Sequence, residues 1–78
     1  SKTPNALRVP TDALVRHGTG WAVFRILDGR ARLTPIRIGT GDDRFRAVLG
    51  GLAVGDRVIL FPGDTIADGN RVRGARSN

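Results

Sequence analysis

The sequence predicts an all-β fold, a small antiparallel β-barrel or β-roll of about six short strands with at most one short helical turn. Three observations predict it. The chain has 78 residues, which is enough for a single small core. It contains 11 Gly and 4 Pro but no Cys or Met, and its short apolar runs are bounded by glycine-containing turns. Without cysteine, neither a disulfide nor a thiolate metal site can supplement the core.

The charge balance is strongly basic, with 12 Arg and 1 Lys against 7 Asp and a net charge of +6. Such a surface is compatible with nucleic acid, an anionic membrane surface or an acidic protein partner. The alternative is that arginine simply covers the solvent-facing sides of strands. No run reaches the roughly 18 to 20 apolar residues that span a bilayer, and residues 1–10 lack a signal-peptide core. We therefore expect the chain as given to be soluble. The same observations are compatible with its being a piece of a longer protein.

One stretch is helix-like, and it follows Pro10. Thr11 or Asp12 is suited to cap a turn there, which would continue until Gly18 ends it. Everything else is typical of strands and turns.

A β-hairpin is predicted around Asp28 and Gly29. Residues 20–28 and 30–38 are both rich in apolar and β-branched side chains. Between them, Asp-Gly is a strong signal for a type I′ turn, because both central residues of that turn need positive φ. This turn makes Asp28 and Gly29 structural residues.

The hairpin register predicts which side chains share a face. Phe24 lies opposite Leu33, and Arg25 lies opposite Arg32. We expect a core face made of Phe24, Ile26, Ala31 and Leu33. The opposite face places the like charges of Arg25 and Arg32 together, so this face must be exposed to solvent or contact an anion. A bulge or kink is expected near residues 34–35, because the inward parity changes there and Pro cannot donate a ladder hydrogen bond.

The second half of the chain also indicates strands. Residues 44–49 alternate as a half-buried strand, and residues 57–61, the run RVILF, suit a central strand covered on both faces. A short strand around Val72 follows a turn at Asp68-Gly69 or Gly69-Asn70.

Between these strands, the loop GGLAVGD has three further structural residues, Gly51, Gly55 and Asp56. The glycines supply backbone freedom so that Leu52 and Val54 can tuck beneath the sheet. Asp56 is expected to accept hydrogen bonds from the loop's own amides.

The order of four segments, LRVPTDALV, WAVFRILDGRARLTPIRIGTG, GLAVGDRVI and DGNRV, resembles a known family. It is similar to the C-terminal, membrane-proximal domain of periplasmic adaptor proteins, also called membrane fusion proteins or the HlyD family. The resemblance covers residues 7–72, nearly the whole chain. Its most recognisable segment is G-L-x-x-G-D-x-V, from Gly51 to Val58. Each segment is short and its pattern allows many substitutions, but the order and spacing of the four segments together are specific.

The resemblance implies a non-catalytic subunit of a tripartite efflux system, most often of the resistance-nodulation-division class. Such a domain is expected to dock on the inner-membrane transporter, with other adaptor protomers forming a ring and an indirect link to an outer-membrane channel. It implies a periplasmic location, attachment to the inner membrane through other parts of the full protein, and proximity to anionic lipid. Residues 1–9 would end the connection from a preceding β-barrel domain, residues 10–73 would form the membrane-proximal domain, and residues 74–78 a frayed tail.

No catalytic, cofactor or metal site is expected. His17 has no nearby Ser or Cys partner, and its pairing with Asp12 has no recognised metal-ligand spacing. Asp42 and Asp43 are adjacent, so on a strand they would point to opposite faces. The two Gly-Thr-Gly sequences complete no phosphate-loop pattern and open no helix.

Candidate docking residues lie in loops 16–20 and 41–46 and on the charged face of the hairpin. They are Arg16, His17, Trp21, Arg25, Arg32, Asp42, Asp43, Arg44 and Arg46. Arginine side chains there can make charge-assisted bonds to acidic patches. Trp21 either anchors a partner or caps the barrel.

The alternative function is a basic small-barrel module that binds nucleic acid non-specifically. A single-strand platform needs exposed rings interleaved with basic residues. The three Phe fall on apparent core faces or within the apolar run, which leaves Trp21 as the remaining ring. We therefore expect no nucleic-acid partner. Steeply salt-dependent binding to random duplex would favour the alternative.

Overall fold

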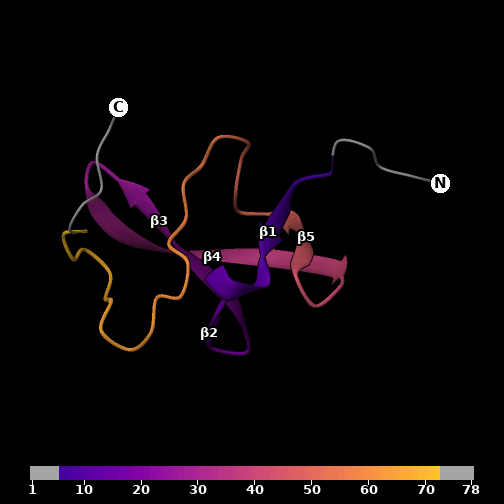
Figure 1. The fold of residues 1–78 in the computed structure, drawn as a ribbon, viewed down its shortest axis with the longest axis horizontal. Coiled ribbons are helices and arrows are strands. Elements are labelled where there is room, and N and C mark those ends of the chain that lie inside the picture. The colour runs from indigo at the N-terminus through magenta and orange to yellow at the C-terminus, as the bar shows by residue number, and fades with distance from the viewer. Residues whose placement is uncertain (1–5, 73–78) are drawn as a thin grey trace.

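The structure, a computed structural model, describes residues 6–72. It forms one antiparallel sheet of five strands in the order β1-β5-β4-β3-β2 (Figure 1). The elements are β1 (Arg8–Pro10), the 3₁₀ turn η1 (Thr11–Ala13), β2 (Val15–His17), β3 (Gly20–Leu27), β4 (Arg30–Gly41) and β5 (Phe45–Gly50). The all-β prediction is confirmed. The sheet is not closed, so the term barrel is only approximate.

The predicted hairpin is confirmed as β3 and β4. Arg25 pairs with Arg32 and Phe24 with Leu33, in the expected register. Asp28 has φ 52° and Gly29 has φ 75°, the positive values that a type I′ turn requires. The local turn chemistry therefore determines this pairing.

The predicted bulge near residues 34–35 is wrong, because regular pairing of β3 with β4 continues through Pro35 to Ile36. The amides of Ala31 and Leu33 donate away from β3, to the Asn70 carbonyl and to Asp68 Oδ1. Since alternate amides of a strand point the same way, a donor at position 35 would also point away from β3. Proline there removes no β3–β4 hydrogen bond.

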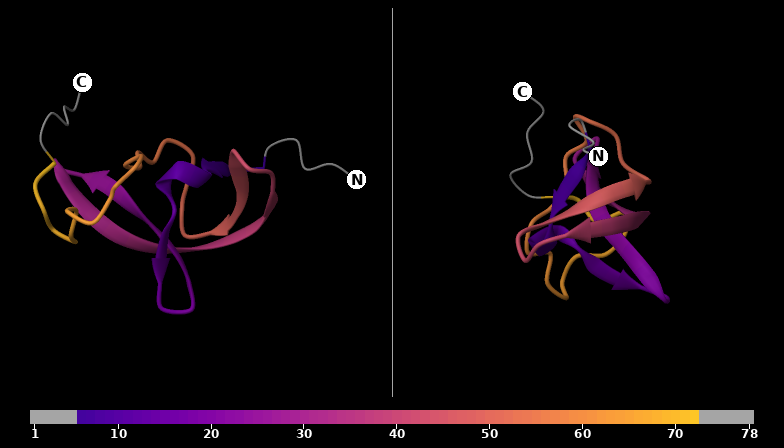
Figure 2. Two further views of the ribbon diagram at one scale, coloured as in Figure 1. Left: turned by 60° about the horizontal axis from the view of Figure 1, so that its bottom comes forward. Right: turned by 90° about the vertical axis from the view of Figure 1, so that its right-hand side faces the viewer.

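The irregularity lies further along β4 instead. The pairing of β4 with β5 shifts register between Arg37 and Ile38 and again between Ile38 and Gly41. Figure 2 shows β4 as a long curved strand, whose first half pairs with β3 and whose second half pairs with β5. The curvature wraps one face of the sheet around the core.

The core cluster lies on the hairpin face of Arg25 and Arg32, which was expected to be exposed to solvent or to contact an anion. This corrects the prediction. Val23 and Ile36 are buried there, together with Val9 of β1 and Ala13 of η1. Partly buried side chains that pack against this cluster are Leu14, Trp21, Ile38, Val48, Leu52 and Val58. The predicted face is buried as well at Phe24 and Ala31. Curvature of the sheet explains the core cluster, because β1, η1 and the loop after β5 lie over its concave side (Figure 2).

The helical turn after Pro10 is confirmed but is short and has no side-chain cap. Thr11 Oγ1 donates to the Asp43 carbonyl, 2.9 Å away, and so ties η1 to the turn between β4 and β5. The helix does not continue to Gly18, because Val15 pairs with Ala22 as the start of β2.

The loop after β5 largely follows the prediction. Gly51 has φ 101° and Gly55 has φ 93°, and Asp56 Oδ2 accepts a hydrogen bond from the Ala53 amide at 2.9 Å. Leu52 packs against the core. The prediction was wrong for Val54, which is 85% exposed.

The predicted central strand at residues 57–61 is also wrong. Val58 makes one isolated bridge to Arg25, flanked by hydrogen bonds from the Ile26 amide to the Arg57 carbonyl and from the Ile59 amide to the Phe24 carbonyl. The short strand β2 covers only the first residues of β3, so this segment takes the rest of the same edge.

The final segment begins with the predicted turn, since Gly69 has φ 89°. Arg71 then bridges to Arg30, and the Val72 amide donates to the Gly29 carbonyl. This segment therefore lies on the edge of β4 that β3 leaves free. The predicted frayed tail, residues 74–78, lies outside the described residues.

Candidate docking surfaces

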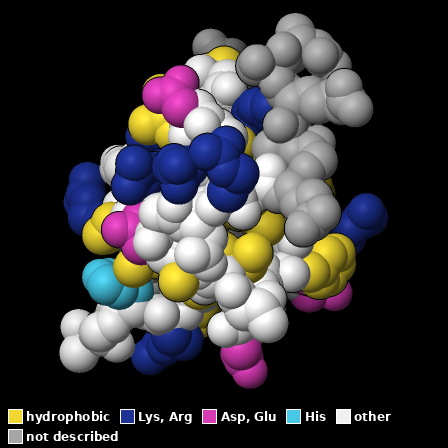
Figure 3. Space-filling model, turned by 90° about the vertical axis from the view of Figure 1, so that its left-hand side faces the viewer, with side chains coloured by type: hydrophobic (Ala, Val, Ile, Leu, Met, Phe, Trp, Pro, Cys, Tyr) yellow, Lys and Arg dark blue, Asp and Glu magenta, His cyan; other side chains and the backbone are white. Residues whose placement is uncertain are grey.

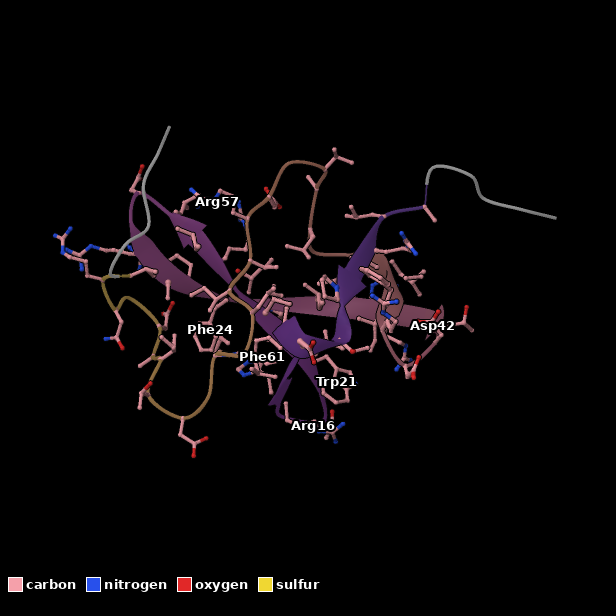
Figure 4. All side chains as sticks on the ribbon, in the orientation of Figure 1. Arg16, Trp21, Phe24, Asp42, Arg57 and Phe61 are labelled. Carbon is pink, nitrogen blue, oxygen red and sulfur yellow. The ribbon has the colours of Figure 1, made fainter. Side chains whose placement is uncertain are left out.

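The first candidate surface is the β2–β3 hairpin. Arg16 and Trp21 are cross-strand partners, and the Arg16 guanidinium carbon lies 4.6 Å from the centre of the Trp21 ring. Trp21 is half-buried against the core, so it both covers the core and carries the arginine. His17 is exposed at the end of β2, opposite Gly20. This hairpin projects from the rest of the sheet (Figures 2 and 4).

The second candidate surface is the turn between β4 and β5. Asp42 Oδ1 accepts hydrogen bonds from the amides of Arg44 and Phe45, both at 2.9 Å. These amide bonds stabilise the carboxylate and lower the pKa of Asp42 below its usual value. Asp42 therefore shapes the turn, while Asp43 and Arg44 are exposed beside it.

Arg46 has a structural function in the same turn. Its Nε and Nη2 both donate to the Gly39 carbonyl, at 3.0 and 2.8 Å. Since this fork joins β5 to β4 and is partly buried, Arg46 is the least available of the predicted docking arginines. Nearby, the Arg8 guanidinium stacks 4.5 Å from the centre of the Phe45 ring.

The third candidate surface carries Arg25 and Arg32. Arg25 Nη2 contacts Asp56 Oδ1 at 3.3 Å, so one arginine of this like-charge pair meets an anion. Arg32 remains exposed to solvent. Arg30 and Arg71, which the sequence reasoning missed as site residues, join the pair through their own bridge. The alternation of arginine with Val72 was visible in the sequence, but its pairing partner was not.

The structure does not bring the three groups into one site. In Figure 1 the β2 turn, the β4–β5 turn and the closed end of the β3–β4 hairpin point to three different sides of the molecule. Each predicted docking residue therefore remains a prediction for its own surface. Phe61, expected within a covered strand, is instead 73% exposed.

Function also depends on whether residues 6–72 contain metal-ligand clusters, membrane-spanning helices or hollows. Within that range, no three His, Cys, Asp or Glu side chains gather as metal ligands. Across the same residues, no helix has the length and apolar character needed to cross a membrane. A shallow open hollow lies beside β4 at Pro35, Ile36 and Arg37, where Gly50 and Gly51 line its other side.

Comparison with known proteins places this sheet in a family. The family described as "YknX, C-terminal permuted SH3-like domain" matches residues 6–74. A protein named "Putative efflux system component YknX", from Bacillus subtilis (strain 168), is 31% identical over 65 residues. That match covers 83% of this chain and 17% of the relative, so the chain spans about a sixth of the relative's length. No solved structure gave a significant match. The chain therefore belongs to the YknX C-terminal domain family and is a C-terminal domain of a membrane fusion, or adaptor, protein.

Proposed function

We propose that this domain is a non-catalytic docking module of an efflux adaptor, which binds an inner-membrane transporter and contributes to assembly of the pump. The family match and the efflux name of the relative support an efflux adaptor role. An efflux component works with transporter components and is membrane-associated, and we place this domain on the periplasmic side. The work is mechanical, since rigid strands present turns to a partner.

The sequence resemblance extends this proposal. It adds a ring of adaptor protomers around a transporter of the resistance-nodulation-division class and an indirect link to an outer-membrane channel. It also adds proximity to anionic lipid and a connection from a preceding domain. We place that connection before Arg8, since β1 and Val9 belong to the same sheet and core as the rest.

We assign the docking contact to the β2–β3 hairpin. The observation that carries this assignment is the stack of Arg16 on Trp21. Stacking restrains the arginine before a partner arrives, so less conformational freedom is lost on binding. Trp and Arg are also the residue types that most often dominate binding energy at interfaces. An acidic patch on the transporter is the complement that this hairpin fits.

The test is a pull-down of the transporter with the full protein carrying Arg16→Glu. Reversing the charge should reduce capture about tenfold, because a close like-charge contact replaces an attraction. Arg44→Glu is the matched control, with the same charge change at an exposed position on another turn. It should leave capture within about twofold if the β2–β3 hairpin is the contact.

Both variants should fold normally, because Arg16 and Arg44 are exposed, and circular dichroism verifies this. Undiminished capture by Arg16→Glu would contradict the assignment of the hairpin. Loss of capture with Arg44→Glu alone would move the contact to the β4–β5 turn.

A further inference from the structure

Four arginines lie on one face of the sheet at the closed end of the β3–β4 hairpin. Arg25 is directly opposite Arg32, and Arg30 is directly opposite Arg71. Arg30 and Arg32 are two residues apart on β4, so their side chains share a face. Directly paired residues also share a face. The register therefore collects Arg25, Arg30, Arg32 and Arg71, which we call the arginine face, from three separate segments of the chain.

Two members of the arginine face each have a polar partner for one guanidinium nitrogen. Arg25 is paired with Asp56 at 3.3 Å, and Arg30 Nη1 donates to the Gly69 carbonyl at 3.1 Å. The neighbouring carboxylate of Asp68 is already used, since its Oδ1 accepts the Leu33 amide at 2.9 Å. Asp28 lies at the exposed turn of the hairpin.

The side chains of the other two members, Arg32 and Arg71, are exposed and have no ion-pair or hydrogen-bond partner within residues 6–72. Figure 3, which views this side of the molecule, shows basic side chains gathered in a row. Like charges held opposite each other destabilise a sheet. An anionic ligand would relieve that repulsion, so the arrangement is most stable when such a ligand is bound.

We propose that the arginine face binds an extended acidic protein segment with Asp or Glu at alternate positions. Side chains at alternate positions of an extended chain are about 6.8 Å apart on one side. The spacing of Arg30 and Arg32 along β4 is the same, because β4 is also an extended strand. Each guanidinium can hold a carboxylate through two parallel hydrogen bonds. An acidic segment laid along β4 therefore meets its arginines in register, and Arg71 adds a contact from the neighbouring segment.

A lipid surface is the less suitable occupant. Peripheral membrane binding combines basic residues with apolar side chains that enter the interface. Leu27 is the one large exposed apolar residue of the β3–β4 hairpin, at 44% exposure. The other large exposed apolar side chains in the described part of the chain are Leu49, Val54, Leu60 and Phe61, which belong to β5 and the segment after it. Arginines at fixed positions on a sheet also distinguish one spacing of carboxylates from another, whereas binding to anionic lipid depends on the net charge of the protein surface.

This inference goes beyond the transporter contact, because it concerns a different surface and can fail separately. The experiment titrates the full protein with two peptides of one composition. One peptide alternates threonine and glutamate, and the other carries its glutamates consecutively. We expect the alternating peptide to bind about fivefold more tightly, because only its carboxylates match the arginine spacing.

The decisive variant is Arg32→Gln combined with Arg71→Gln. Binding of the alternating peptide should weaken about tenfold, since two charge-assisted contacts are lost. The matched control combines Arg37→Gln with Arg44→Gln, which removes the same charge from exposed positions elsewhere and should leave binding unchanged.

Three results would overturn the proposal. Equal binding of both peptides would show that charge, not spacing, is recognised. Equal weakening of peptide binding by the control pair would show that the net charge of the protein, not the arginine face, determines binding. Binding of vesicles containing phosphatidylglycerol that is lost with Arg32→Gln and Arg71→Gln, without peptide binding, would assign the face to lipid.

Discussion

The β3–β4 hairpin and the segment of residues 51–72 have similar shares of apolar residues but very different structures. The hairpin pairs continuously from Leu27 and Arg30 to Trp21 and Ile36. The later segment has only isolated bridges, at Val58 and Arg71. It also exposes Val54, Leu60 and Phe61, whereas the hairpin buries Val23 and Phe24.

The difference teaches that a strand-like sequence forms a strand only when a neighbour is available. The Asp28-Gly29 turn brings its own two strands together locally. The RVILF run has no such turn, and it reaches the sheet where only part of the β3 edge is free. Its conformation is therefore determined by distant contacts such as the hydrogen bond from the Phe61 amide to the Asp12 carbonyl, at 2.9 Å.

The largest effect is expected at the start of the irregular segment, with Gly51→Ala. Gly51 has φ 101°, and a Cβ there would lie 2.7 Å from the Pro35 carbonyl oxygen and 2.9 Å from the Ile36 Cα. Backbone strain and the steric clash together should lower the free energy of unfolding by about 3 kcal/mol. Thermal unfolding of the domain measures it.

Gly55→Ala is the matched control within the same loop. Its φ is 93°, but a Cβ there would meet nothing within 4 Å. Only the backbone strain remains, so we expect a loss of about 1 kcal/mol. Equal losses at Gly51 and Gly55 would contradict the close approach of the loop to β4.

The second prediction is that Phe61→Asn stabilises the domain. Phe61 has φ 52°, a region that bulky residues rarely adopt and that Asn tolerates. Phe61, labelled in Figure 4, is 73% exposed, so little burial is lost. The free energy of unfolding should rise by about 0.5–1 kcal/mol.

Leu60→Asn separates the backbone effect from the change in polarity. Leu60 is 49% exposed and does not have positive φ. The same polar substitution there should be neutral or mildly destabilising. A gain in stability at both positions would mean that polarity, not backbone strain, explains Phe61.

The smallest effect is expected in the β4–β5 turn. Unlike the two regions compared above, this turn is organised by a single side chain, that of Asp42. Hydrogen bonds from the Phe45 and Arg44 amides lower the pKa of Asp42 in the folded state below the usual value of an aspartate. The folded state therefore gains stability from Asp42 above that value. This gain is lost as the pH falls through the lowered folded pKa.

Asp42→Asn should keep the turn, because the amide oxygen can accept the same bonds, and should remove this contribution to acid sensitivity. The melting temperature of the variant should fall slightly less steeply below pH 4 than that of the natural sequence. Parallel melting curves over pH 2–6 would contradict a role for the Asp42 carboxylate.

The candidate site was predictable only where its residues are neighbours in sequence. Arg16 and Trp21 lie in one hairpin, and Arg25 and Arg32 pair across one turn, so local register placed each pair. Arg71 was missed because it reaches Arg30 through a pairing of distant segments. Arg46 was predicted as a docking residue on the basis of its charge, but the shape of the turn places its guanidinium on the Gly39 carbonyl.

The sequence by itself determined the all-β class, the β3–β4 register and the glycine turns at Gly51 and Gly55. Each of these depends on backbone geometry within a few residues, which turn chemistry restricts strongly. Only the tertiary structure decided which face of the hairpin holds the main core and where the RVILF run lies. Both faces of the hairpin are apolar enough to be buried, so the choice depended on how β4 curves and on what β1, η1 and Leu52 cover. Burial stabilises either face in proportion to its apolar area, and the local sequence cannot rank the two.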